Sequence, residues 1–423
     1  MNELKGKRLL IMSGSAAACE IVREARKMGI EVYATDYYET SPVKEISDKS
    51  FKVSTADVDA VVKLCRDEKI DGIFSGYTDS VLPYMQQVAV RLGIPFWGNE
   101  SNIAMCIDKL KFKQACEKVG VKTVPYILVK EGKFDEKAMI MDYPVVVKPV
   151  DNSGSRGVYK VYDPKDLRKY YDKALSFSQK KEVLIEKLMP VDSEFSAYYL
   201  VGGGILCAMG DRYVDVVDES TAPQPKGMFF PSVRLNRYLK TTNNAVLRLF
   251  EQNDMHEGFA FVQGFECDGE FYIHEIGYRL NGGFTYKFTE YYNGLNIPRE
   301  LIRFSLTGKM QDSEISKADP QFNGFGLLLT VGLNEGEIGE ISGIEEIRKH
   351  PNIIDFIPQH KVGDSLMAHG TSMQIFGYGF CVAQTRAELA DAVDFVKKKL
   401  RVRDKENNNM LVGIIDANSV KFP

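Results

Sequence analysis

The chain has 423 residues, and at roughly 150 residues per domain this length favours about three domains. Apolar residues make up 44% of the sequence, charged residues make up 26%, and the formal net charge is −4. This composition argues against a disordered, fibrous or membrane protein, and no basic excess is present to attract nucleic acid or an anionic membrane. An anionic ligand must therefore be held by a local cluster of cations.

The seven cysteines are scattered, with no CxxC pair and no cluster with histidine, which argues against a zinc site. The apolar run Leu9–Met12 near the N-terminus is too short for a secretory leader. No run of about 18 apolar residues is present to span a bilayer. We therefore expect a cytoplasmic protein with reduced thiols.

The first hundred residues alternate between strand and helix patterns. Strands are expected at 9–12, 31–35 and 72–75, and helices at 21–28, 58–64 and 81–92. Such alternation predicts a parallel sheet that binds ligands at the carboxyl ends of its strands. The turn Ser13–Ala18 lacks two of the three glycines of a dinucleotide-binding motif, so we expect a Rossmann-like domain without an NAD site.

After Ile107 the pattern changes. A helix is expected to begin at Asp108 and to end at Gly120. The strands expected next lie at 124–129, 145–149, 158–161 and 183–188. Residues 180–330 are rich in strand patterns, with a hairpin turn at Asp268-Gly269, and a further helix is expected at 386–400.

Lys148 stands at the end of an apolar strand and precedes a loop, residues 152–157, that contains two glycines and two serines. A loop without bulky side chains can donate backbone N–H and hydroxyl hydrogen bonds to phosphates, while the lysine supplies charge. The Walker sequence is absent, and no helix pattern follows the loop. Taken alone, a plain β-turn explains the loop equally well.

Two carboxylates follow that suit the nucleoside part of a nucleotide. The strand at 183–188 ends in Glu186-Lys187-Leu188, whose backbone and carboxylate can read the edge of an adenine. Glu194 lies shortly after this strand and can hold ribose hydroxyls. The strand end and Glu194 together therefore favour a nucleoside site over a simple turn.

The expected hairpin at 259–276 carries Gln263 on one strand and Glu275 on the other. Oxygen ligands on paired strands suit Mg²⁺, which takes a few protein oxygens and completes its shell with phosphates and water. If the register slips by one residue, Val262 faces Glu275 instead, and Glu266 is then the alternative ligand.

Arg279 follows this hairpin, and a forked guanidinium beside a metal carboxylate suits a developing acyl phosphate. His274 precedes Glu275 directly and is expected on the opposite face of the strand, as a packed or solvated histidine.

The order of these features resembles the ATP-grasp superfamily, in the branch of carbamoyl phosphate synthetase, biotin carboxylase, purine-pathway carboxylases and L-amino acid ligases. The resemblance covers roughly residues 1–310, and residues 320–415 resemble the small C-terminal module of the amino acid ligases. It implies a mixed α/β and α+β fold. The implied parts are a Rossmann-like pre-ATP-grasp domain (1–107), an ATP-grasp domain (108–310, with a lid at about 124–185) and a C-terminal module (311–423).

The resemblance also implies a role for each matching residue. The implied ATP-binding residues are Lys109, Lys148, Ser153, Gly154, Ser155, Gly157, Glu186, Lys187, Leu188 and Glu194. Gln263 and Glu275 are implied as ligands of Mg²⁺, or of Mn²⁺ in its place, and Arg279 as the arginine that steadies the acyl phosphate. The implied partners are a small-molecule carboxylate, an amine and a second copy of the chain in a homodimer.

The motif departs from the family pattern, which is close to Glu-Ile-Asn-Pro-Arg, because Gly277 and Tyr278 stand in place of Asn and Pro. The Asn of that pattern is also a metal ligand. Either one Mg²⁺ loses a side-chain ligand, or Asn281 compensates and joins Arg279 in the catalytic group. The sequence leaves both possibilities open.

We therefore expect an ATP-dependent ligase that activates a carboxylate as an acyl phosphate and joins it to an amine. One alternative is a bicarbonate-activating enzyme of the carbamoyl phosphate or purine-carboxylase type. Another is a nucleotide-binding protein without ligase activity, which Gly277 favours.

Overall fold

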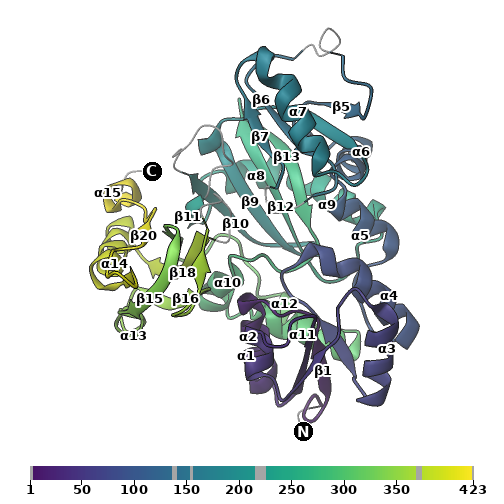
Figure 1. The fold of residues 1–423 in the computed structure, drawn as a ribbon, viewed down its shortest axis with the longest axis vertical. Coiled ribbons are helices and arrows are strands. Elements are labelled where there is room, and N and C mark those ends of the chain that lie inside the picture. Colours follow the sequence, from purple (N-terminus) through teal and green to yellow (C-terminus); the bar gives the residue numbers. More distant parts are fainter. Residues whose placement is uncertain (1–2, 136–140, 153–155, 215–224, 368–373, 422–423) are drawn as a thin grey trace.

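The computed structural model describes residues 3–135, 141–152, 156–214, 225–367 and 374–421. In Figure 1 an N-terminal sheet lies at the bottom, a lid sheet lies at the top, and a large central sheet lies between them and continues into the C-terminal part at the left. No helix in these described ranges is long and apolar enough to cross a membrane. The mixed fold class expected from the sequence is confirmed.

The N-terminal sheet is parallel, as its alternating pattern predicts, with the strand order β3-β2-β1-β4. Its strands are β1 (Arg8–Ile11), β2 (Glu31–Asp36), β3 (Lys49–Lys52) and β4 (Gly72–Phe74). The helices of this part are α1 (Cys19–Lys27), α2 (Pro42–Ile46), α3 (Val58–Asp67), α4 (Leu82–Leu92) and α5 (Glu100–Ile107). The edge strand β3 was not expected, because its polar sequence has no apolar run.

The lid sheet is antiparallel, with the order β5-β8-β6-β7, and α7 (Leu167–Ser176) contacts it. Its strands are β5 (Tyr126–Lys130), β6 (Val145–Pro149), β7 (Tyr159–Val161) and β8 (Glu182–Lys187). Because side chains alternate along a strand, Val145 and Val147 enter the lid core while Val146 and Lys148 face the opposite side. The period of the strand thus places Lys148 on the open face.

The central sheet has the order β13-β12-β9-β10-β11-β14-β18-β16, with β20 (Leu411–Val412) paired to β14. Its strands are β9 (Glu194–Leu200), β10 (Ile205–Val214), β11 (Pro225–Phe230), β12 (Phe259–Cys267), β13 (Glu270–Gly277), β14 (Phe325–Leu333), β16 (Ile353–Pro358) and β18 (Ile375–Ala383). Hydrogen-bonded strands therefore continue across residue 311, where the sequence suggested a domain boundary. The division into three domains remains a prediction.

A smaller sheet and several helices complete the fold. The smaller sheet contains β17 (Ser365–Leu366), β15 (Gly336–Ser342) and β19 (Arg401–Asp404). The remaining α-helices are α6 (Lys109–Val119), α8 (Leu235–Thr241), α9 (Asn243–Gln252), α10 (Tyr286–Asn293), α11 (Ile297–Thr307), α12 (Asp312–Ile315), α13 (Ile344–Ile347), α14 (Arg386–Lys399) and α15 (Ala417–Lys421). Helix α11 packs against β4 and α1, so the chain returns to the N-terminal part after β13.

Tyr278 joins the N-terminal part to the central sheet at the end of β13. Its buried hydroxyl lies 2.6 Å from the backbone oxygen of Glu257 and 2.9 Å from that of Trp97. The indole Nε1 of Trp97 donates in return to the backbone oxygen of Tyr278, at 3.1 Å. The residue that replaces the family proline thus satisfies buried polar groups on both sides of this junction.

Tyr278→Phe should lower the free energy of unfolding by about 1–3 kcal/mol, because buried carbonyl oxygens lose their donor. Urea unfolding of the variant and of a Tyr291→Phe control measures this. Tyr291 is exposed, and its hydroxyl makes no hydrogen bond within the described residues, so the control should stay within about 0.5 kcal/mol of the parent. Equal effects of the two substitutions would contradict this account of the junction.

Candidate functional site

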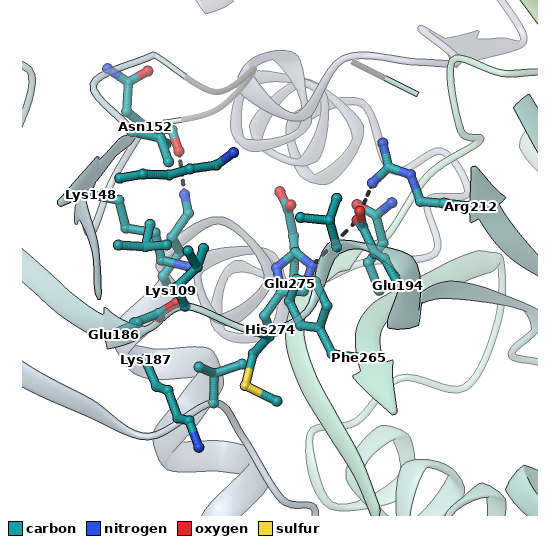
Figure 2. Close-up of a pocket in the computed structure, with 18 residues that line it drawn as sticks. Lys109, Lys148, Asn152, Glu186, Lys187, Glu194, Arg212, Phe265, His274 and Glu275 are labelled. Carbon is teal, nitrogen blue, oxygen red and sulfur yellow. Dashed lines mark hydrogen bonds and ion pairs between the residues drawn. The ribbon is translucent and has the colours of Figure 1, made fainter. Parts of the chain in front are cut away.

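The open face of the lid sheet and one end of the central sheet enclose a cavity of about 370 Å³ (Figure 2). The predicted site residues that line it are Lys109, Lys148, Glu186, Lys187, Leu188, Glu194, Gln263 and Glu275. A second cavity of about 270 Å³ shares Lys109, His274 and Glu275 with the first and extends to Asp79 of the N-terminal part. Residues predicted from six separate sequence segments therefore meet in one place.

Among the described residues, Gly157, Arg279 and Asn281 do not line the first cavity. Ser153, Gly154 and Ser155 lie outside the described residues. Gly157 has a positive φ of 77°, and an added Cβ would lie 2.9 Å from the Cβ of Phe177, so this position requires glycine. Asn281 is buried, and its Oδ1 accepts a hydrogen bond from Thr285 Oγ1 at 2.8 Å, which leaves this oxygen committed within the fold.

Arg279 is held by a residue of the N-terminal part. Its guanidinium donates to both carboxylate oxygens of Asp79, at 2.7 and 2.5 Å, and to the backbone oxygen of Leu280 at 2.8 Å. Asp79 lines the second cavity, so the Arg279 guanidinium lies at the border of that cavity. The sequence gives no local signal for this pairing, because 200 residues separate the two partners.

Helix α6 places two lysines at the base of the cavity. The carboxylate of Asp108 accepts from the backbone N–H of Lys111 at 2.9 Å and caps the helix, and Gly120 ends it with a left-handed conformation. Lys109 and Lys113 are four residues apart and therefore lie on the same helix face. Lys109 donates to the backbone oxygen of Asn152, and the buried Lys113 is paired with Glu186.

Glu186 is a buried carboxylate between two lysines. Its oxygens lie 2.7 Å from Lys148 Nζ and 3.0 Å from Lys113 Nζ. Burial alone would raise its pKa, but the two ammonium groups outweigh burial and lower the pKa to about 2. The two lysines therefore hold this carboxylate in its ionised form.

Two backbone donors at the end of β8 and just after it are already used. The N–H groups of Lys187 and Leu188 donate to the backbone oxygens of Pro125 and Pro144, both at 3.1 Å. The N–H of Met189, which also lines the cavity, makes no hydrogen bond within the described part of the chain. Met189 is therefore a candidate backbone donor that sequence reasoning missed, since an apolar residue gives no sign of a free backbone group.

The hairpin of β12 and β13 places Gln263 opposite Glu275, so the register that would have paired Val262 with Glu275 is not adopted. Gln263 Nε2 donates to Ser196 Oγ at 3.2 Å, which leaves the side-chain oxygen for the cavity. Burial opposes ionisation of Glu275, but Lys109 and other nearby cations hold the pKa of this carboxyl below its ordinary value.

The expectation that His274 faces away from Glu275 is wrong. Gly264 pairs with Ile273 while Gln263 pairs with Glu275, so His274 is the extra residue of a β-bulge. A bulge breaks the alternation of side chains, and both residues line the cavity. Strict alternation from sequence has no means of detecting such a bulge.

His274 belongs to a small group around Glu194. Figure 2 shows Arg212 and Glu194 on one side of the cavity, with His274 turned toward Glu194. His274 Nε2 lies 3.8 Å from Glu194 Oε1, and Arg212 donates to the same oxygen. Burial opposes ionisation, but Arg212 and His274 lower the pKa of Glu194. The ribose carboxylate predicted from sequence is therefore ionised and held in place.

Steric crowding explains why glycine stands at position 277 in place of the family asparagine. Gly277 pairs with Phe261 across the hairpin, and an added Cβ at Gly277 would lie 2.3 Å from the Phe261 ring. The same ring lies under the Arg279 guanidinium, 5.3 Å from ring centroid to Cζ. Phe261 thus fills the space that a larger side chain would need.

The oxygen ligands present fit one Mg²⁺ ion. The Glu275 carboxylate and the Gln263 amide oxygen come from paired strands and face the same cavity, as suits an ion that also takes phosphate and water oxygens. No group of three or more His, Cys, Asp or Glu side chains suited to a metal occurs in the described residues. A second ion gains no side-chain ligand from Gly277, and Asn281 is not among the described residues that line either cavity.

Glu186→Gln should lower the free energy of unfolding by about 3–5 kcal/mol, because Lys148 and Lys113 then remain buried without a counter-charge. Glu39→Gln is the matched control, since Glu39 is an exposed residue paired with Lys52, and should change little. Chemical unfolding at neutral pH measures both variants. A loss below about 1 kcal/mol for Glu186→Gln would contradict the structural role of this ion pair.

Gly277→Asn should destabilise the protein by about 1–3 kcal/mol through overpacking against Phe261. The cost should disappear when Phe261→Ala is already present, because the space is then open. A double-mutant cycle by urea unfolding therefore should give a coupling energy of about 1–3 kcal/mol. Additive effects would show that Phe261 is not the reason for glycine at this position.

Comparison with known families gives three matches along the chain. The PylC-like N-terminal domain matches residues 9–95, the D-ala D-ala ligase C-terminus matches 115–196, and the L-amino acid ligase C-terminal domain 2 matches 331–405. A formate-dependent phosphoribosylglycinamide formyltransferase of Sulfolobus acidocaldarius is 26% identical over 208 residues, or 47% of this chain and 52% of that protein. The chain spans about half the length of the curated relatives it matches.

Solved structures resemble the fold over nearly the whole chain. An L-amino acid ligase from Bacillus licheniformis superposes with a TM-score of 0.76 at 17% identity, covering 95% of this chain and 99% of that one. The biotin carboxylase domain of 2-oxoglutarate carboxylase from Hydrogenobacter thermophilus gives a TM-score of 0.76 at 17% identity, covering 96% and 91%. The resemblance to the ATP-grasp superfamily noted from the sequence motifs is thereby confirmed.

Proposed function

We propose that the chain is an ATP-dependent ligase that activates a carboxylate as an acyl phosphate and joins it to an amine. One observation carries this proposal. A single cavity has lysines on its lid side and Gln263 with Glu275 on the facing hairpin, which are the groups that a polyphosphate and its metal ion require. The family matches to ligase domains support the same chemistry.

Separate residues of the chain would bind the phosphates and the metal ion. Lys109 and Lys148 supply charge to the phosphates, and Glu186 fixes the position of Lys148. Gln263 and Glu275 would hold Mg²⁺, which would offset the negative charge that grows during transfer. Catalysis then rests on positioning and charge neutralisation, as in other phosphoryl transfers.

The second cavity suits the carboxylate and the amine. It shares Lys109 and Glu275 with the nucleotide cavity, so a substrate inside it meets the terminal phosphate. A carboxylate oxygen of the substrate attacks the γ-phosphorus and ADP leaves. The amine nitrogen then attacks the acyl carbon and phosphate leaves. Arg279, held by Asp79 at the border of this cavity, is placed to steady the acyl phosphate.

The named activities of similar proteins are consistent with a carboxylate substrate. The curated relative is named as dependent on formate, which is a carboxylate, and one structural neighbour is named as an L-amino acid ligase. Another neighbour was solved with MgADP and bicarbonate.

All seven cysteines are unpaired thiols in the structure, which supports the expectation of a cytoplasmic protein. The homodimer remains a prediction that sedimentation can measure.

The activity is tested by ADP release with Mg²⁺ and ATP. One set of reactions contains pooled amino acids and other small carboxylic acids with amines, and a second contains bicarbonate with the same amines. ADP release only in the first set supports the proposal. Release only with bicarbonate favours the bicarbonate-activating alternative, and nucleotide binding without release in either set favours the non-catalytic one.

Glu275→Gln should lower the turnover rate at least about 100-fold, because loss of a metal ligand costs more than loss of its supporting residues. Nucleotide affinity measured without Mg²⁺ should change little, since the hinge after β8 is untouched. Glu270→Gln, an exposed position on the same strand, is the control and should retain full turnover. Full activity of Glu275→Gln would contradict the assignment of the metal site.

A further inference from the structure

One cation of the nucleotide cavity has no role in the proposed function so far. Lys160 lies on the edge strand β7, is only 7% exposed, and lines the cavity. Among the residues that the structure describes, no carboxylate and no hydrogen-bond acceptor pairs with its ammonium group. A buried charge without a partner costs free energy, so its presence calls for a ligand.

The other buried cations of the cavity are already engaged. Lys148 is paired with Glu186, and Arg212 is paired with Glu194. Lys109 donates to the backbone oxygen of Asn152. Each of these cations is paired with a group of the protein. The Lys160 ammonium has no such partner among the described residues and is available to a ligand in the cavity. Lys160 is therefore placed to meet an acceptor that the protein itself does not provide.

The register of the lid sheet locates Lys160 along the nucleotide. Lys160 pairs with Val146, and Val146 pairs with Glu186 at the end of β8, so these residues form one row across the sheet. Lys148 stands two residues further along β6, about 7 Å closer to the loop at 152–157. Lys160 thus lies closer than Lys148 to the segment that follows β8.

We propose that Lys160 binds the nucleoside monophosphate part of the nucleotide, donating a hydrogen bond to a purine ring nitrogen or an α-phosphate oxygen. The proposal rests on nucleotide binding in this cavity, as in the proposed function. It assigns Lys160 to the part of the ligand that ATP, ADP and AMP share, while Lys109 and Lys148 meet the outer phosphates. Lys160→Met should therefore weaken the binding of all three nucleotides to a similar degree.

The test is competition of ATP, ADP and AMP against a fluorescent ATP analogue, without Mg²⁺. Lys160→Met should raise the dissociation constant of each nucleotide about 10- to 100-fold, the range for a hydrogen bond to a charged group. Adenosine separates the two acceptors, because its affinity falls equally if the ring nitrogen is bound and stays unchanged if the α-phosphate is bound. Lys160→Arg should retain most of the affinity. Lys165→Met, an exposed lid position, is the control and should behave as the parent.

A second readout separates binding from folding. The melting temperature of the nucleotide-free Lys160→Met variant should equal or exceed that of the parent, because an unpartnered buried charge has been removed. Unchanged affinity for ATP, a loss confined to ATP and ADP, or a clearly lowered melting temperature would each overturn the proposal. Failure of the parent protein to bind ATP would instead contradict the proposed function, before any variant is compared.

Discussion

The geometry of the nucleotide cavity depends on one buried ion cluster, in which Glu186 lies between Lys148 and Lys113. The three residues are at most 6% exposed and come from β8, β6 and α6, so the cluster fixes the lid sheet against the helix that carries Lys109. Each member is costly to bury alone, and the arrangement is stable only when all three are present. Glu186 therefore fixes the position of Lys148 in the cavity.

At the opposite end of the cavity, packing decides which metal ligands are available. Phe261 occupies the space beside Gly277 and also supports the Arg279 guanidinium from below. Exchange of the family asparagine for glycine is therefore coupled to an aromatic residue on the neighbouring strand. Arg279 is in turn tied to the N-terminal part through Asp79. These features leave the cations and the Glu275 carboxylate in place, which is why we favour an active ligase over a non-catalytic protein.

Sequence patterns predicted the parallel N-terminal sheet and the lid strands, because each depends on local periodicity and turn residues. They left the register of Gln263 with Glu275 open, because it depends on the bulge at His274. Ion pairs between residues that lie far apart in the sequence, such as Asp79 and Arg279, gave no local pattern. Lys113 was missed although it lies one helical turn after Lys109 on the same face. The bulge at His274 and the strands that join the central sheet beyond residue 311 depend on tertiary pairing, which local periodicity does not report.

The central claim is that a carboxylate of the substrate takes up the terminal phosphate of ATP. The most direct measurement is oxygen transfer, with a pool of amino acids and other small carboxylic acids labelled with ¹⁸O at the carboxylate, unlabelled ATP and an amine. If an acyl phosphate forms, the phosphate released on amine attack carries one ¹⁸O atom from the carboxylate in each turnover. Release of ADP with unlabelled phosphate would show that water, and not a carboxylate, attacks the nucleotide, and would contradict this account.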